Sequence, residues 1–126
     1  FSIRVEPSLT TVAATDWDAC VRGADGSGRA NPFVSHAFLL ALETSGCTGG
    51  RSGWMPAHVM VEDQEGKLVA CAPCYLKSHS QGEYVFDHAW ADAYERAGGR
   101  YYPKLQVASP FSPVTGARLL VDPTRA

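Results

Sequence analysis

A hairpin pattern near the middle of the chain limits the possible folds more than any other feature. Two apolar stretches, AHVMV (57–61) and KLVACAPCYLK (67–77), flank the polar stretch EDQEG, in which Gly66 suits a tight turn. Strands joined by so short a connection pair antiparallel. We therefore expect a mixed or mainly antiparallel sheet in this protein.

Three segments around the hairpin have the start and stop signals of helices. Thr15, followed by acidic residues, predicts the start of a first helix that ends at Gly23. Ser35 predicts the N-cap of a second helix, whose apolar stripe ends at Gly46. Asp87 is in position to cap a third helix that starts near residue 88 and ends at the glycine pair 98–99.

Short strands complete the pattern. Residues 2–6 alternate between apolar and polar and predict a first strand, and residues 101–109 and 117–121 predict two more. The expected order is β-α-α-β-β-α-β-β. This order predicts the α/β class, with helices packed on the sheet.

Composition excludes several classes of protein. With 126 residues, of which 45% are hydrophobic and 19% charged, the chain is expected to be one domain or part of one, spanning residues 1–126. A net charge of −2 with interspersed signs gives no basic surface for DNA. No apolar run is long enough to span a membrane. The chain lacks a starting Met and ends just after a predicted strand, so we expect a piece of a longer protein.

The Cys71-Ala72-Pro73-Cys74 motif has the spacing of a thioredoxin-like redox site. Such a site needs its first Cys at the start of a long helix, whereas the surrounding residues predict one continuous strand. Strand residues three apart point to opposite faces, so the two sulfurs should diverge. No second pair at zinc-ligand spacing is present, and we expect no metal site. We interpret both thiols as packing residues and place Pro73 at a sheet edge or bulge.

Cysteine usage also bears on the compartment. The four cysteines are too sparse for the disulfide framework of a small secreted domain. Free, mostly buried thiols in a reducing environment are the better interpretation. We therefore expect a cytoplasmic protein.

Polar and aromatic residues are concentrated in residues 77–120, which hold four of the five tyrosines. Such rings suit pocket walls, because each offers apolar area and a hydrogen-bonding tip. On the predicted third helix, His88 shares a polar face with Asp92, while Trp90 and Tyr94 lie on another face. A solvated face and an ordinary core contact explain the same spacing. Lys104 could bind an anion or extend away from the sheet.

The stretches PFVSHAFLLALETSG and YLKSHSQGEYVFDHAWADAYERAGGRYYPKLQVASPFSPVTGARLL resemble the N-terminal part of the bacterial FemAB-like family, over residues 31–121. The resemblance implies a GNAT-type fold, in which a central mixed sheet is flanked by helices, with a second GNAT-like half as a partner in the same protein. It also implies transfer of an acyl or aminoacyl group to an amine. The donor would be an acyl-CoA or an aminoacyl-tRNA, and the acceptor a small molecule or cell-wall precursor.

The glycine-rich turn that holds the CoA pyrophosphate in typical GNAT enzymes is absent, so we expect this portion alone to bind no cofactor and to be inactive. A non-catalytic domain that recognises a cell-wall precursor or a protein partner is the alternative.

The same resemblance suggests an acceptor pocket in the intact protein. The residues expected around it are His79, Glu83, Tyr84, Asp87, His88 and Trp90. Asp87 and His88 are the candidates for proton transfer. Lys77, Lys104 and Arg118 would favour a negatively charged substrate, and Gly116 lies in a turn whose backbone amides could face a ligand.

Overall fold

The structure is a computed structural model that describes residues 1–24, 26, 28–81, 83 and 87–124. Its α-helices are α1 (Ala14–Gly23), α2 (His36–Thr44) and α3 (His88–Arg96), and two short 3₁₀ turns are η1 (Leu9–Thr11) and η2 (Pro32–Val34). Its strands are β1 (Ser2–Glu6), β2 (Trp54–Pro56), β3 (His58–Glu62), β4 (Leu68–Ala72), β5 (Cys74–Lys77), β6 (Lys104–Val107) and β7 (Leu120–Val121). The chain is thus of the α/β class, as its sequence predicts.

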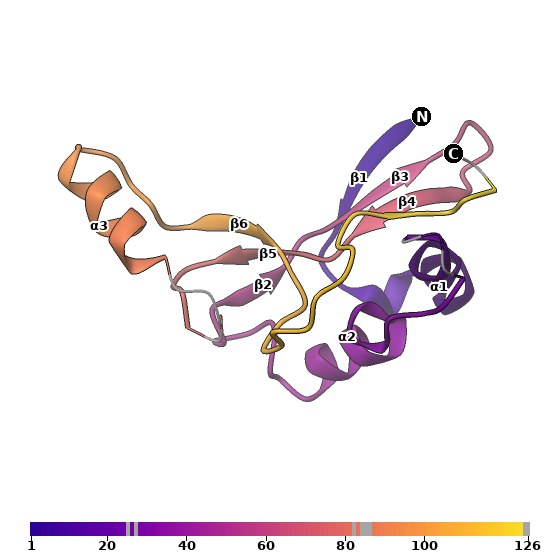
Figure 1. Cartoon of the computed structure of the whole chain (residues 1–126), viewed down its shortest axis with the longest axis horizontal. Helices are drawn as coiled ribbons and strands as arrows, with labels where there is room; N and C mark the ends of the chain where they lie inside the picture. Colours follow the sequence, from indigo (N-terminus) through magenta and orange to yellow (C-terminus); the bar gives the residue numbers. More distant parts are fainter. Residues whose placement is uncertain (25, 27, 82, 84–86, 125–126) are drawn as a thin grey trace.

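The described strands form two antiparallel sheets in place of the single sheet expected. Sheet A has the strand order β1-β3-β4-β7, and sheet B has the order β2-β5-β6. Figure 1 shows α1 and α2 together on one side of sheet A, while α3 lies beyond sheet B at the other end of the molecule. The two sheets therefore have different coverings.

The hairpin is longer than the sequence pattern shows, and it crosses from one sheet to the other. After β4, Pro73 separates β4 from β5, and opposite it Ala57 separates β2 from β3. Proline has no amide hydrogen to donate, so it fits where a strand leaves its sheet. The Ala108 amide donates to the Pro73 carbonyl at 3.2 Å, and the Ala57 amide donates to the Cys74 carbonyl at 2.9 Å. These bonds join the two sheets at the crossing.

The hydrophobic core lies between sheet A and helices α1 and α2. Met60, Cys71 and Leu120 are neighbours across three strands and belong to one buried cluster with Trp17 of α1 and Leu39 of α2. The Trp17 indole donates to the Val34 carbonyl at 2.8 Å, so its polar atom is satisfied inside the core. Apolar burial therefore holds α1, α2 and sheet A together.

The helix N-caps show which of the capping signals in the sequence predict the structure correctly. The Ser35 hydroxyl accepts the Phe38 amide at the start of α2, as predicted, although the helix ends at Thr44, before Gly46. In contrast, α1 begins at Ala14, so Thr15 lies inside the helix and the prediction of a Thr15 cap is wrong. Asp87 occupies the N-cap position of α3 without capping it, because its carboxylate is engaged elsewhere.

Both cysteines lie in strands, as predicted, but the single continuous strand that was expected is divided at Pro73 into β4 and β5. Cys71 lies in β4 and Cys74 in β5, and both are buried free thiols. Cys71 belongs to the core cluster that faces the helices, and Cys74 does not. Within the described part of the chain, no helix has the length and apolarity that crossing a bilayer requires.

Candidate functional site

Two lysines lie side by side on sheet B. Lys77 of β5 and Lys104 of β6 are direct cross-strand partners, a pairing of like charges that is unfavourable by itself. The Glu83 carboxylate offsets it, because its two oxygens accept from the two ammonium groups at 2.9 Å each. The Glu83 side chain is only 6% exposed, so this bridge is shielded from water.

A second carboxylate extends the network at the start of α3. Asp87 accepts hydrogen bonds from Lys104, from the Ser80 hydroxyl and from the Tyr101 phenol. The Ser80 hydroxyl is also hydrogen-bonded to Tyr102. We call Lys77, Ser80, Glu83, Asp87, Tyr101, Tyr102 and Lys104 the lysine–carboxylate cluster. It contains two cations and two anions, so its formal charges balance.

The cluster shifts the pKa values of its members in opposite directions. Burial alone would raise the pKa of Asp87, but the hydrogen bonds from Lys104, Ser80 and Tyr101 lower it well below the usual range. Burial opposes the charged form of Lys104, yet the hydrogen bonds to Asp87 and Glu83 raise its pKa. Asp87 and Lys104 are therefore held as an ion pair across the neutral pH range.

Lys77 is the most deeply placed charge of the cluster. Its side chain is fully buried, and its ammonium lies 3.6 Å from the centroid of the Trp54 ring and donates to the Gln81 carbonyl at 2.8 Å. Burial lowers the pKa of Lys77 even though Glu83 opposes this shift. The cation–π contact and the two hydrogen bonds replace the water that the ammonium loses.

His79 lies near the cluster but has a different role. Its Nδ1 accepts the Gln81 amide at 3.0 Å, which places the proton on Nε2, and Nε2 donates to the Ser52 carbonyl at 3.1 Å. The ring also fills the space beside Gly53, where an added Cβ would lie 2.1 Å from its Nε2. His79 therefore joins two loops, and both of its nitrogens are in use.

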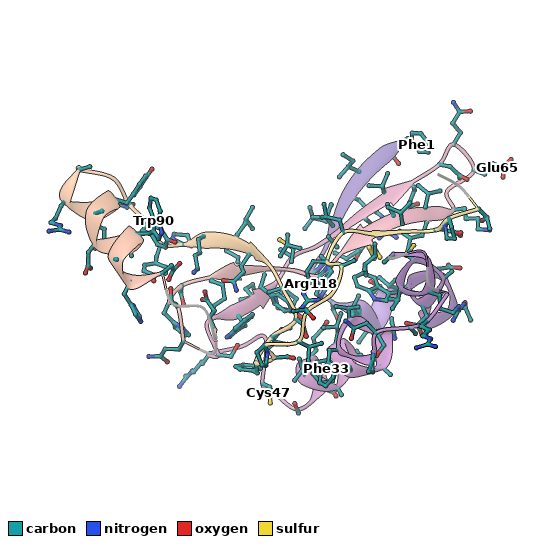
Figure 2. All side chains as sticks on the ribbon, viewed as in Figure 1. Phe1, Phe33, Cys47, Glu65, Trp90 and Arg118 are labelled. Atoms are coloured by element: carbon teal, nitrogen blue, oxygen red, sulfur yellow. The ribbon has the colours of Figure 1, made fainter. Side chains whose placement is uncertain are left out.

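The other predicted residues lie outside the cluster. His88 is exposed in the first turn of α3, and Trp90 is 75% exposed on the same helix. Gly116 lies against Asn31, and Arg118 donates to the carbonyls of Val114 and Gly116. Figure 2 shows Arg118 near the junction of the sheets, well apart from Trp90. The structure thus does not gather Arg118 with the two lysines.

Tyr84 lies outside the described residues. It was expected to form part of the pocket wall, so the acceptor pocket stays a prediction. Of the ten residues predicted for the site, Lys77, Glu83, Asp87 and Lys104 lie together in the cluster. In the part of the chain that the structure describes, no group of three or more His, Cys, Asp and Glu side chains could hold a metal ion.

Sequence reasoning missed Ser80 and Tyr101 as donors to Asp87, and Tyr102 as the partner of Ser80. Gln106 was missed as well; with its amide nitrogen turned toward Glu83, it donates at 2.9 Å. The alternation in KLQV was the available signal, because it places Lys104 and Gln106 on the same face of β6. Tyr101 and Tyr102 follow a loop, and no periodic pattern of neighbouring residues predicts their contacts with Asp87 and Ser80.

Comparison with known proteins gives a family. Residues 8–126 match the FemAB-like family, which is described as a peptidoglycan biosynthesis/recognition family. The match covers nearly the whole chain and includes the three α-helices, sheet B and all of sheet A except β1. The chain belongs to the FemAB-like family. This result confirms the resemblance seen in the sequence and extends it toward the N-terminus.

The family match places the FemAB-like chain in a peptidoglycan-related context. Neither the curated proteins nor the solved structures that were compared with it include a match. The roles of the cluster residues therefore have to be argued from the geometry of this chain.

Proposed function

We propose that this FemAB-like chain is the N-terminal portion of an N-acyltransferase that moves an acyl or aminoacyl group to an amine acceptor. The family match supports a cell-wall precursor as the acceptor. The sheet-and-helix architecture is compatible with a GNAT-like fold, which a second half of the same protein would complete. The acyl donor would be an acyl-CoA or an aminoacyl-tRNA.

The observation that carries the proposal is the lysine–carboxylate cluster at the start of α3. A transferase must hold two substrates in a fixed geometry, and rigid, hydrogen-bonded groups serve this need better than mobile ones. Asp87 accepts three side-chain donors: Ser80 from the loop after β5, Tyr101 from the segment before β6, and Lys104 from β6 itself. The cluster thereby anchors the first turn of α3, where His88 is exposed, to sheet B.

The two candidates for proton transfer have different roles in this proposal. The lowered pKa of Asp87 makes it a weak base at neutral pH. We therefore assign to Asp87 the positioning of the first turn of α3. His88 is the better candidate base, because histidine is the side chain that most often transfers protons in enzymes.

The test uses the intact protein, supplied with acyl-CoA or aminoacyl-tRNA donors and with amine-bearing cell-wall precursors. Removing a general base costs about 10²–10⁴-fold in rate. We expect His88→Ala to lower kcat by this factor with little change in KM. Asp87→Asn should lower kcat and also shift the pH–rate profile.

Asp92→Asn, on an exposed position of the same helix, is the matched control and should leave the rate unchanged. Unchanged transfer by both the His88 and the Asp87 variants would refute the assignment.

A second candidate function is recognition of a cell-wall precursor without turnover. The family description includes recognition, and all four charged groups of the cluster are paired with one another. In that case, precursor binding would be saturable and no donor would be consumed. The same assay separates the two functions.

A further inference from the structure

A cavity lies at the C-terminal end of α2, away from the lysine–carboxylate cluster. It has a volume of about 520 Å³ and is lined by three segments: the chain after β1, the last turn of α2 with the glycine-rich loop that follows, and β2. Cys47 marks this loop in Figure 2. No residue of the lysine–carboxylate cluster lines the cavity. The inference below goes beyond the proposed function and does not depend on it.

The wall of this cavity contains a carboxylate that is nine-tenths buried. Glu43 lies in the last turn of α2, and its side chain is 10% exposed. Its oxygens accept the Leu9 amide at 3.2 and 3.3 Å and lie 3.3 Å from Nε2 of His58. A carboxylate has about four acceptor positions, so capacity remains for a further donor.

His58 does not neutralise this carboxylate. Its Nδ1 accepts the Cys74 amide at 3.3 Å, so the single proton of the neutral ring is on Nε2 and is donated to Glu43. Burial lowers the pKa of His58, although the hydrogen bond to Glu43 opposes this shift. The imidazole is therefore neutral at pH 7. Among the described residues, Glu43 forms no ion pair with a lysine or an arginine.

The position of Glu43 is unfavourable on local grounds. The C-terminal end of a helix carries a partial negative charge, so an acidic side chain in the last turn is repelled there. A buried carboxylate without a cation adds the cost of lost hydration. Within the described ranges, Glu43 is held only by neutral donors, the Leu9 amide and His58, and this arrangement points to a ligand that supplies a cation.

Two buried hydroxyl groups near Glu43 also lack partners. Thr48 lines the cavity and is 2% exposed, and its hydroxyl has no hydrogen bond within the described residues. The phenol of Tyr75, which is fully buried, is likewise unsatisfied there. Burial, and then the charge of Glu43, raise the pKa of Tyr75, so this phenol stays protonated. Natural proteins leave few such groups unpaired.

We propose that this cavity binds an organic ammonium group, with Glu43 as its counter-ion and the Thr48 hydroxyl as an acceptor. An ammonium group donates three hydrogen bonds and carries a positive charge that can pair with Glu43. Arg51 also lines the cavity, but within the described residues it forms no ion pair with Glu43. Ser8, Thr10 and Thr44 supply further hydroxyl oxygens along the wall. Because no residue of the lysine–carboxylate cluster lines this cavity, we treat this ligand as distinct from the acceptor amine of the proposed transfer reaction.

The probe is n-butylammonium chloride, titrated into the intact protein at pH 7 while the amide signals of Gly46, Gly49 and Gly50 are followed by NMR. We expect saturable shifts of these signals, since all three glycines line the cavity. A charge-assisted hydrogen bond in a shielded site corresponds to about tenfold or more in affinity. Glu43→Gln should therefore weaken binding by at least about this factor. Thr48→Val should weaken it less.

Three comparisons make the result decisive. Glu95→Gln makes the same change on the exposed face of α3 and should leave affinity unchanged. Butanol, which has the same chain without the charge, should not bind. Butyrate should not bind either, although Arg51, which is exposed, also lines the cavity.

The proposal is overturned if n-butylammonium produces no saturable shift. It is also overturned if the Glu43→Gln and Thr48→Val proteins, shown to be folded by circular dichroism, both bind n-butylammonium with the affinity of the parent protein. Binding of butanol or butyrate with the same affinity as n-butylammonium would overturn it as well.

Discussion

Sheet A and sheet B bury their covered faces in different ways. Behind sheet A, side chains such as Trp17, Leu39 and Met60 exclude water by apolar contact. On sheet B, Lys77 and Glu83 are buried in a network of ion pairs. Apolar burial is non-directional and tolerates small changes of angle. Buried ion pairs depend on every partner, because one lost member leaves a charge without compensation.

The difference in burial suggests that the two sheets have different roles in the protein. The helix-covered sheet A supplies most of the apolar core and gives the FemAB-like chain a rigid base. Sheet B carries groups whose pKa values are shifted and whose positions depend on one another. Perturbed titratable groups are concentrated at functional sites more often than in purely structural regions. Sheet A also holds a group with a shifted pKa, His58, but the shifted groups Asp87 and Lys104 of the sheet B cluster are joined by an ion pair, which supports our proposal that the chemistry takes place there.

The largest effect is expected at the core of sheet A. Trp17→Ala should lower the free energy of unfolding by about 3–5 kcal/mol, because it leaves a cavity and removes the hydrogen bond to Val34. Trp90→Ala is the control on α3, where the side chain is 75% exposed, and should change stability by at most about 0.5 kcal/mol. Urea denaturation measures both. Equal losses of unfolding free energy for the two variants would show that sheet A does not depend on apolar burial as proposed.

A somewhat smaller effect is expected from the bridge on sheet B. Glu83→Gln keeps the shape of the side chain but leaves Lys77 buried without its counter-ion, and should cost about 3 kcal/mol in unfolding free energy. Lys77→Met combined with Glu83→Gln should recover part of this loss, since no charge then remains at the buried position. The same denaturation series measures both proteins. A double variant less stable than Glu83→Gln alone would show that the lysine is favourable even when unpaired.

The smallest effect concerns acid stability. The pKa of Asp87 is lowered in the folded protein, so Asp87 contributes stability above its unfolded pKa of about 3.9 and loses it as the pH falls further. Between pH 7 and pH 2, the parent protein should therefore lose about 1–2 kcal/mol more than Asp87→Asn does. Thermal unfolding at a series of pH values measures the difference. Parallel pH curves for the two proteins would mean that the cluster does not stabilise the ionised carboxylate.

The sequence predicted the local features well. The hairpin turn at Gly66, the cap at Ser35 and the strand nature of Cys71 and Cys74 all follow from short patterns, and the structure confirms them. The family resemblance suggests Lys77, Glu83, Asp87 and Lys104 for a substrate site, and the structure brings these four together, while the acceptor pocket itself stays a prediction. The division into two sheets was missed, because a proline within a strand does not reveal what pairs on either side of it.

Sequence alone therefore determined most of the elements, though not β2, and the family of this chain, since both are carried by patterns of neighbouring residues and by a match over residues 8–126. The tertiary structure decided which charges meet. Glu83 bridges Lys77 and Lys104 across two strands, and Glu43 meets His58 from a different element. Such contacts join residues that are distant along the chain, and their free energy depends on burial, which no local pattern encodes.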